Sequence, residues 1–498
     1  MHYRLALART TVSRSLSALA VAVAVAFVGA APSASATPVA ALTSEYPGIS
    51  HVATDLALHA DPMGGLHLVT RTTLRVQVSA QPEDSFHAYR VAKLFQHSGV
   101  AYLLAPHLAG RFESLETGPS YMESFVGHLL AEGHEVWGFD NRGTTLSEAD
   151  CAKPEVQALV QTWGIDSLVA DASLVRDLVQ LTWPWQAKKV ILGGQSLGAI
   201  TTLATINADP GRYDGFFANE GTLYAASPGV SGDNQDLDGD TFEDNPGLAD
   251  QWFGFVSSVM IPTLGTCDLT TETLMKVVVP LAFSPAGLDL PRPELDLDGD
   301  PFNDGGEPML DAIDAAFVAL RGTPMNLREF VVFAFSVPGP NPNMPGIPGY
   351  TLLASEILDL GTTPFGDLSD LGDLADPAKY TFTFADVDRV VADALVFGNL
   401  ASRGLLAEMQ GALGSLATNP LTGTDHAANL GSFTGHAVFL AGERGFGSAL
   451  VDTSALMTGA ASLATQVYAG YGHGDIRFSQ NYAADMMAPV LALGEAVK

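Results

Sequence analysis

The sequence predicts an α/β fold in which a mostly parallel central sheet is flanked by helices. Short apolar runs alternate with helical segments between residues 100 and 219, and one glycine-rich turn joins a strand to a helix. Strands that alternate with helices at this spacing form βαβ units, which place the strands parallel. A long stretch without this pattern, residues 221–424, then interrupts the alternation and predicts a large insertion.

The first part of the sheet is predicted from hydrophobic patterning. Residues 67–78 alternate in polarity and are rich in β-branched residues, which indicates one or two strands. Continuous apolar runs indicate strands buried on both faces, and the intervening periodicity indicates helices. The strands are expected at 100–105, 135–140, 188–192 and 213–219, the helices at 121–132 and 165–182, and an irregular lead-in at 37–50.

The sheet resumes after the insertion. Residues 436–441 and 465–468 have the pattern of two further strands, and residues 483–497 are expected to form a helix that packs on the sheet. Within the insertion, proline and glycine become frequent and apolar stretches appear at 252–264, 274–283 and 327–337. These stretches predict a core for the insertion, and some of them are also expected to line an apolar pocket.

One turn carries a nucleophile motif. Gly194-Gln195-Ser196-Leu197-Gly198 has the spacing Gly-x-Ser-x-Gly between a predicted strand and a predicted helix. Such a turn strains the serine backbone and exposes its oxygen at the positive end of the helix. The glycines let strand and helix approach closely, and the N–H of Leu197 is expected to stabilise an oxyanion.

A histidine in a glycine-rich loop is the candidate base. His473 follows the predicted last strand and precedes the C-terminal helix. An imidazole can take the proton of Ser196 and return it to a leaving group. Asp475 is too close to His473 in sequence to orient it, so we expect a structural role in the loop for Asp475.

With these motifs in place, the chain resembles the α/β-hydrolases, and residues 137–143 are similar to the fourth-strand segment of lipase-like members. The first 36 residues are expected to be a signal peptide, for the reasons given below. For the rest, the resemblance implies a hydrolase core at 37–220 and 425–498, with 221–424 as a cap over the active site. It also implies a second oxyanion donor after the third strand of the fold, the N–H of Leu108.

The acid that orients the histidine stays open between two glutamates. Most α/β-hydrolases place it after the seventh strand, where Glu443 lies here, although the usual spacing falls on Gly445. Some lipase families place it after the sixth strand, where Glu220 lies. We expect either Glu220 or Glu443 to accept the imidazole N–H, with Asp452 as a weaker candidate.

Two acidic loops in the insertion resemble calcium-binding loops. Carboxylates recur at alternate positions, which is the arrangement of an EF-hand-like site. Their mutual repulsion would be relieved by a hard cation. The sequence therefore predicts a structural Ca²⁺ held by Asp236, Asp238, Asp240 and Asp244 in one loop and by Asp296, Asp298, Asp300, Asp304 and Glu307 in the other.

The beginning of the chain predicts export. Arginines precede an apolar run at 16–31, and Ala34-Ser35-Ala36 forms a cleavage site, so we expect a secreted or periplasmic protein. In that oxidising setting Cys151 and Cys267 are expected to form a disulfide. No other hydrophobic span of membrane length follows, and the formal charge of −31 argues against nucleic acid as a partner.

Together these features predict a serine hydrolase that cleaves small-molecule or lipid esters through an acyl-enzyme, without an organic cofactor. Two alternatives stay open. One is a peptidase or amidase that uses the same three residues. The other is a calcium-dependent extracellular binding protein that keeps a hydrolase fold without catalysis. The oligomeric state does not follow from the sequence.

Overall fold

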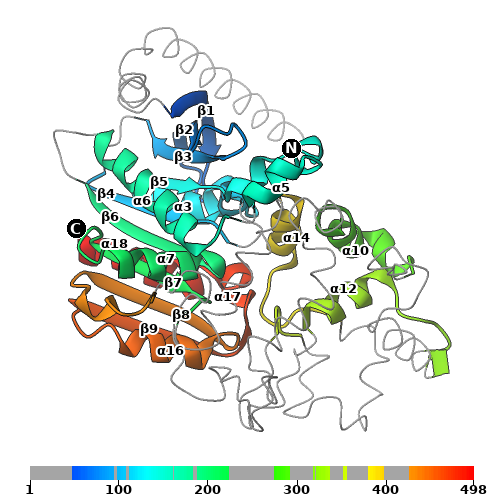
Figure 1. Cartoon of the computed structure of the whole chain (residues 1–498). Coiled ribbons are helices and arrows are strands. Elements are labelled where there is room, and N and C mark those ends of the chain that lie inside the picture. Colours follow the sequence, from blue (N-terminus) through cyan, green and yellow to red (C-terminus); the bar gives the residue numbers. More distant parts are fainter. Residues whose placement is uncertain are drawn as a thin grey trace, which may run out of the picture.

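A computed structural model describes residues 48–94, 98–107, 111–160, 162–182, 188–223, 274–291, 318–319, 321–336, 351–355, 380–396 and 425–498. These residues form a twisted sheet with helices on both faces, and a smaller group of helices lies to one side of it (Figure 1). The predicted signal peptide at 1–36 and the apolar stretch at 252–264 lie outside the described residues.

The sheet of the described residues has nine strands in the order β1-β2-β3-β5-β4-β6-β7-β8-β9. Strands β1 to β3 pair antiparallel, β3 pairs antiparallel with β5, and the others are parallel. The parallel strands end at the same edge of the sheet. Their bounds are β4 Val100–Ala105, β5 Glu135–Phe139, β6 Lys189–Gln195, β7 Gly215–Asn219, β8 His436–Arg444 and β9 Ser462–Gly472.

The antiparallel part of the sheet is more extensive than the sequence predicts. Strand β2 (Leu66–Gln77) matches the expected strand, but β1 (Ile49–Ala60) and β3 (Ser85–Lys93) were not predicted. Ile49 and Ser50 belong to β1, so the expected lead-in at 37–50 is wrong at these two residues. Strand β1 is mostly exposed and pairs with β2 along nearly its whole length. Its backbone hydrogen bonds to β2 stabilise it. Because these bonds need no buried side chains, β1 has only a weak hydrophobic pattern in the sequence.

Helices cover the sheet in two layers, each with its own apolar core. Side chains alternate along each strand, so Leu103 of β4 faces one layer while Tyr102 and Leu104 face the other. The first layer contains α6 Ile165–Leu181, α7 Leu197–Ala208 and α16 Gly447–Ala455. The second contains α3 Phe125–Ala131, α17 Asp475–Phe478 and α18 Ala488–Val497.

Two predicted helices differ in detail from the structure. The helix expected at 121–132 is a 3-10 turn, Tyr121–Glu123, followed by α3. Ser124 separates the two because its side chain accepts the N–H of Gly127 and caps α3. The helix expected at 483–497 begins with a π-helical turn, Ala483–Met487, and continues as α18.

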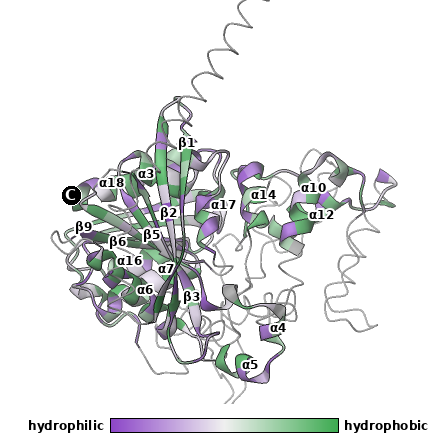
Figure 2. Ribbon diagram, turned by 90° about the horizontal axis from the view of Figure 1, so that it is seen from above, coloured by the Kyte–Doolittle hydropathy of each residue, from purple (hydrophilic) through white to green (hydrophobic). Residues whose placement is uncertain are grey.

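The helices of the insertion form a separate cluster. They are α10 (Val279–Phe283), α12 (Leu327–Ser336) and α14 (Val387–Leu395), and Figure 2 shows them together at one side of the sheet layers. Their buried apolar side chains pack with each other rather than within either core of the sheet. The apolar stretch at 274–283 and the described part of the stretch at 327–337, residues 327–336, thus contribute to a core of the insertion itself.

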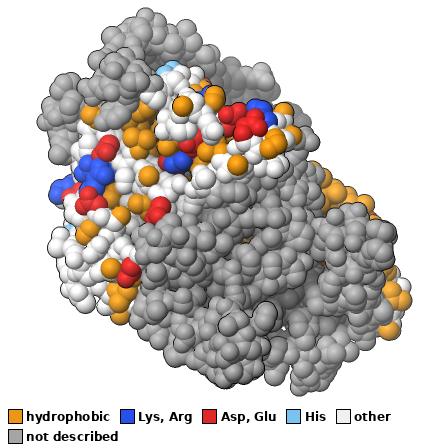
Figure 3. Space-filling view, in the orientation of Figure 1, with side chains coloured by type: hydrophobic (Ala, Val, Ile, Leu, Met, Phe, Trp, Pro, Cys, Tyr) orange, Lys and Arg blue, Asp and Glu red, His pale blue; other side chains and the backbone are white. Residues whose placement is uncertain are grey.

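The described surface carries charges of both signs. On the face in Figure 3, Lys and Arg side chains lie beside Asp and Glu side chains, with hydrophobic side chains scattered between them. Within the part of the chain that the structure covers, no helix combines the length and the apolar character that a membrane crossing requires.

Candidate active site

Ser196 lies at the turn between β6 and α7, at the carboxyl edge of the sheet. Its backbone has φ 56° and ψ −121°, a strained conformation for a residue with a side chain. Its N–H donates to the carbonyl of Asn219 on the neighbouring strand at 2.9 Å. The side chain is partly exposed, so the turn presents a hydroxyl at the strand ends, as the motif predicts.

The two glycines of the motif are needed for space. A Cβ on Gly194 would lie 2.5 Å from the backbone of Gly198, and a Cβ on Gly198 would lie 2.6 Å from the carbonyl oxygen of Ala105. Either side chain would push β6, α7 and β4 apart. Leu197 is the first residue of α7, so its N–H has no acceptor within the helix. That N–H is free to face a developing negative charge beside Ser196.

His473 and Glu220 form a buried pair. His473 follows β9, and its Nδ1 lies 3.3 Å from Oε2 of Glu220. Glu220 has no exposed surface, and it lies directly after β7 with φ 54°. Its carboxylate also accepts the backbone N–H groups of Gly442 and Phe446, the latter at 3.0 Å. The structure therefore brings Glu220 to the imidazole.

The environment of Glu220 has opposing effects on the pKa of its carboxyl group. Burial raises the pKa of this carboxyl, while His473 and the N–H groups of Gly442 and Phe446 act to lower the pKa. The ring of Phe446 packs edge-on against the imidazole, with the ring centroids 5.3 Å apart. Both carboxylate oxygens are thus held by backbone donors: Oε1 accepts the N–H of Gly442, and Oε2 accepts the N–H of Phe446 and also faces the imidazole.

Gly445 makes room for this arrangement. A Cβ on Gly445 would lie 2.2 Å from Oε2 of Glu220, which is far inside van der Waals contact. The usual position of the acid after the seventh strand of the fold is therefore glycine here because the Glu220 carboxylate fills the adjoining space. The absence of a side chain at 445 was a signal in the sequence that the acid comes from another strand.

The other two candidate acids lie elsewhere. Glu443 is exposed, and its carboxylate accepts the N–H of Gly470 at 2.8 Å. Asp452 lies within α16. Of the two glutamates that the sequence leaves open, the structure places Glu220 against His473.

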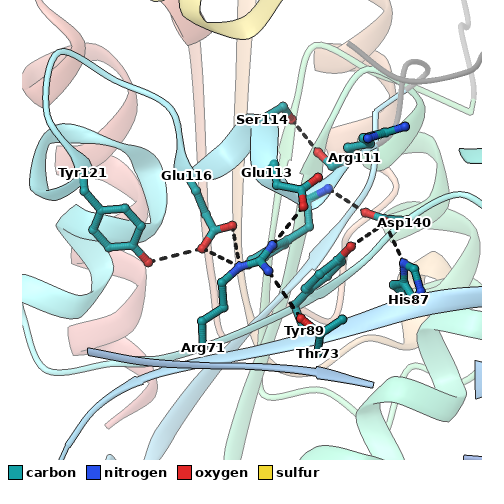
Figure 4. Close-up of polar contacts among 11 residues, drawn as sticks. Arg71, Thr73, His87, Tyr89, Arg111, Glu113, Ser114, Glu116, Tyr121 and Asp140 are labelled. Atoms are coloured by element: carbon teal, nitrogen blue, oxygen red, sulfur yellow. Dashed lines mark hydrogen bonds and ion pairs between the residues drawn. The ribbon is translucent and has the colours of Figure 1, made fainter. Parts of the chain in front are cut away.

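The segment after β4 is held by a buried polar network. Leu108 lies outside the described residues, so its N–H stays a predicted oxyanion donor. Phe112 follows Leu108 by four residues, and its N–H donates to Asp140, which lies directly after β5. Asp140 also accepts the hydroxyl of Tyr89, and both distances are 2.7 Å (Figure 4). Burial raises the pKa of Asp140 to about 7.

A second part of the network pairs one arginine with two glutamates of this segment. Arg71 donates to Glu113 and Glu116, and its guanidinium lies 4.5 Å from the centroid of the Tyr89 ring (Figure 4). Burial raises the pKa of Glu116 to about 7, against the effect of Arg71. These contacts fix the backbone that follows the predicted oxyanion donor.

Known proteins resemble the chain in fold. The family model described as serine aminopeptidase, S33, matches residues 116–226, about a fifth of the chain, and includes Ser196 and Glu220. The strand order and the Ser196 turn agree with that family's fold.

The chain has an α/β-hydrolase fold.

Several solved structures are similar to this α/β-hydrolase at low identity. A Sulfolobus solfataricus protein assigned as a lipase is 12% identical with a TM-score of 0.48, and the match covers 91% of this chain and 100% of that one. A carboxyl esterase from Bacillus coagulans is 12% identical with a TM-score of 0.34, covering 90% and 100% of the two chains. Likeness at this level says nothing about substrate. No curated protein matched the chain.

The insertion of this α/β-hydrolase contacts the histidine loop directly. Residues 351–355 lie against it, where the N–H of His473 donates to the carbonyl of Thr351 at 2.8 Å and the N–H of Gly474 donates to the carbonyl of Leu352 at 2.7 Å. The N–H of Thr351 donates in turn to the carbonyl of Arg444 at 2.8 Å. This strap, residues 351–355, links the end of β8 to the loop that follows β9, and no pattern in the sequence predicted it.

Asp475 completes the link between strap and loop. Its Oδ2 accepts the N–H of Gly472 at 2.6 Å and the N–H of Ala354 in the strap at 2.9 Å. Burial, with a smaller contribution from the nearby Glu220 carboxylate, raises the pKa of Asp475 to about 7. This position agrees with the structural role that we expected for Asp475.

The remaining predicted sites fall outside the described residues. Both acidic loops lie there, and so does Cys267, so the predicted Ca²⁺ sites and the predicted disulfide stay predictions. Among the described residues, no group of three or more His, Cys, Asp or Glu side chains could hold a metal ion. Cys151 is buried in a small apolar cluster with Leu146, Val156 and Trp163.

Proposed function

We propose that this α/β-hydrolase is a serine hydrolase that cleaves carboxylic esters. The observation that carries the proposal is the Glu220–His473 pair at the sheet edge where the strained Ser196 turn presents its hydroxyl. In this mechanism Ser196 attacks the ester carbonyl and His473 accepts its proton. Glu220 orients the imidazole and stabilises its charged form.

The second half of the reaction uses the same groups. The N–H groups of Leu197 and Leu108 stabilise the oxyanion, and His473 returns the proton to the leaving alcohol. Water then attacks the acyl-enzyme with His473 as the base, which releases the acid and restores Ser196. A largely apolar cavity lies beside Gly194 and Gln195, which directly precede Ser196, and its walls include Leu104 and Phe217. This cavity supports an ester with an apolar portion.

The test is hydrolysis of p-nitrophenyl esters of increasing acyl length by the full chain. We expect Ser196→Ala to lower turnover at least about 10³-fold, while Ser167→Ala on α6 retains wild-type turnover. A serine-directed phosphonate should label the wild type and spare Ser196→Ala. Turnover that survives Ser196→Ala would contradict the proposal.

A peptidase or amidase is the second candidate, since the matching family model describes a serine aminopeptidase. The same three residues can expel an amine because His473 can protonate it. Aminoacyl p-nitroanilides and p-nitrophenyl esters of equal size separate the two reactions. A kcat/KM higher for the anilides would favour the peptidase. Labelling of Ser196 without turnover of either class would favour a binding protein.

We also propose that the acidic loops bind Ca²⁺ as a structural ion. Carboxylates without a counter-ion repel one another, so removal of the ion should lower the stability of the folded chain. We expect a lower melting temperature in EGTA than in millimolar calcium, and a smaller difference in Asp298→Asn/Asp300→Asn. Equal melting temperatures in both solutions would contradict calcium binding.

Export is the last part of the proposal. We propose cleavage after Ala36 and a disulfide between Cys151 and Cys267, which places the mature protein outside the cytoplasm. The mature protein should begin at Thr37 by N-terminal sequencing. Peptide mass spectrometry without reductant should recover the two cysteines as one linked peptide, whereas alkylation of both cysteines without reductant would contradict the bridge.

A further inference from the structure

A cavity lies beside the nucleophile turn and contains two arginines. Gly194 and Gln195, which directly precede Ser196, form one wall, and Arg389 of α14 and Arg477 of α17 form another. The other walls are largely apolar and include Leu104, Phe125, Phe217 and Met486. The cavity thus combines an apolar interior with two guanidinium groups, next to the two residues that precede the serine.

The charge of Arg477 is balanced within the protein. Its guanidinium donates to Oε1 of Gln195 at 2.8 Å and to the buried carboxylate of Asp393. Arg477 therefore ties the histidine loop to both the nucleophile turn and α14. Its donors are directed at protein groups, so it is unsuited to hold a substrate.

Arg389 differs from Arg477 in its partners. It donates to the backbone carbonyl of Glu123 at 3.1 Å, and its guanidinium lies 4.0 Å from the centroid of the Tyr482 ring. No carboxylate of the described residues pairs with it. The Glu123 carboxylate accepts the hydroxyl of Ser120 at 2.7 Å instead. Of the two arginines in the cavity, one is paired with an acid and the other keeps an unbalanced charge.

An unbalanced guanidinium in a cavity has a specific use. Arginine presents five N–H donors in a planar fork that matches the two oxygens of a carboxylate. Within the described part of the chain, Arg389 uses one of these donors, in its hydrogen bond to the neutral backbone carbonyl of Glu123. The protein as a whole has a formal charge of −31, so a local cation at this cavity offsets a general repulsion of anions from the site.

We propose that Arg389 binds an anionic oxygen group of the substrate, so that the enzyme favours esters that carry a carboxylate near the scissile carbonyl. This inference rests on the proposed ester hydrolysis. The carboxylate belongs either to the acyl part or to the alcohol part of the ester. The apolar walls contact the carbon chain that separates the charge from the carbonyl.

Paired substrates measure this preference. For the acyl part, the pair is mono-p-nitrophenyl glutarate and p-nitrophenyl pentanoate, which have the same chain length. For the alcohol part, it is para-acetoxybenzoate and its methyl ester. The quantity of interest is the ratio of kcat/KM for the anionic ester to that for the neutral ester.

Arg389→Met should lower this ratio by roughly 10- to 100-fold for one of the two pairs, because a hydrogen bond between charged groups is lost. Arg389→Lys should keep part of the preference. The matched control is Arg328→Met on α12, where the guanidinium also donates to backbone carbonyls, those of Ala282 and Ser284. Arg328 does not line the cavity, so its replacement should leave the ratio unchanged.

An equal loss on the anionic and the neutral ester in Arg389→Met would show that Arg389 only stabilises the fold, and it would overturn the inference. If that variant does not fold, the wild type still provides a test, since free glutarate should inhibit pentanoate hydrolysis competitively. Absence of inhibition would overturn the inference as well.

Failure of the proposed function gives a different result. If the wild type hydrolyses none of these esters, ester hydrolysis itself is wrong. The anion site is then tested by the melting temperature, which glutarate should raise in the wild type and not in Arg389→Met.

Discussion

Two glutamates lie at the ends of neighbouring strands of the sheet but in opposite environments. Glu220 follows β7 and is fully buried, whereas Glu443 lies near the end of β8 and is exposed. The strands are parallel neighbours, with Asn219 paired to Leu440, so both glutamates reach the same sheet edge. Only the carboxylate of Glu220 is placed against His473.

Backbone geometry explains the difference. The register between β8 and β9 shifts between Gly442 and Arg444, where β9 carries the extra residues of a bulge. Glu443 lies opposite this bulge, and its carboxylate accepts the N–H of Gly470 within it. Glu220 has a positive φ and meets the N–H groups of Gly442 and Phe446. An acid at a strand end therefore contacts the base only if the turn aims it and the neighbouring loop leaves room.

The largest expected effect comes from exchanging the two glutamates for glutamine. Glu220→Gln should lower kcat by roughly 10³- to 10⁴-fold, because the amide neither stabilises the imidazolium nor accepts both backbone N–H groups. Glu443→Gln is the matched control and should stay within about 2-fold, as expected for an exposed side chain. Steady-state kinetics on p-nitrophenyl esters gives both values, and the reverse order would assign the acid to Glu443.

Filling the space at Gly445 should disturb the pair sterically. Gly445→Ala places a methyl group where the Glu220 carboxylate lies, so we expect a loss of roughly 1–3 kcal/mol in the free energy of unfolding. Denaturant unfolding measures the loss. Gly211→Ala is the control, since the nearest atom would lie 3.8 Å from its Cβ.

A double-mutant cycle shows whether the clash is with Glu220. In the Glu220→Ala background the added methyl group at 445 has space, so its cost should fall toward zero. An unchanged cost would place the strain elsewhere in the loop.

The third carboxylate of the site, Asp475, should make stability depend on pH. Its folded pKa of about 7 lies above the ordinary value, so its protonated form favours the folded state. That contribution is complete below about pH 4 and is lost as the pH rises through about 7.

The melting temperature should therefore fall between pH 5.5 and pH 8.5 in the wild type and fall less in Asp475→Asn, by a few degrees. Asp388→Asn, at an exposed position of α14, should match the wild type. A larger fall in Asp475→Asn than in the wild type would refute the raised pKa.

The smallest effect is expected at Phe446. Its backbone N–H holds Glu220 while its ring only packs against His473. Phe446→Leu keeps the N–H and removes the ring, so kcat should fall by about 2- to 10-fold, the worth of one aromatic contact. A loss as large as that of Glu220→Gln would mean that the ring, rather than the backbone donor, positions the pair.

Much of the fold was predictable because it depends on local patterns. The apolar runs at 100–105, 135–140, 188–192 and 213–219 correspond to β4, β5, β6 and β7. Strands β1 and β3 were missed, since β1 is mostly exposed and depends on its pairing with β2. The strap at 351–355 was missed because its contacts with the histidine loop use backbone groups, which leave no pattern of side chains.

The sequence by itself determined the nucleophile turn and the position of His473, because a strand, a tight glycine turn and a helix are encoded within about ten consecutive residues. It left the acid open between Glu220 and Glu443. Only the tertiary structure decided between them, through a contact across 253 positions of the chain. The direction of each carboxylate depends on a bulge, a positive φ and the space beside Gly445, and these exist only once the strands are assembled.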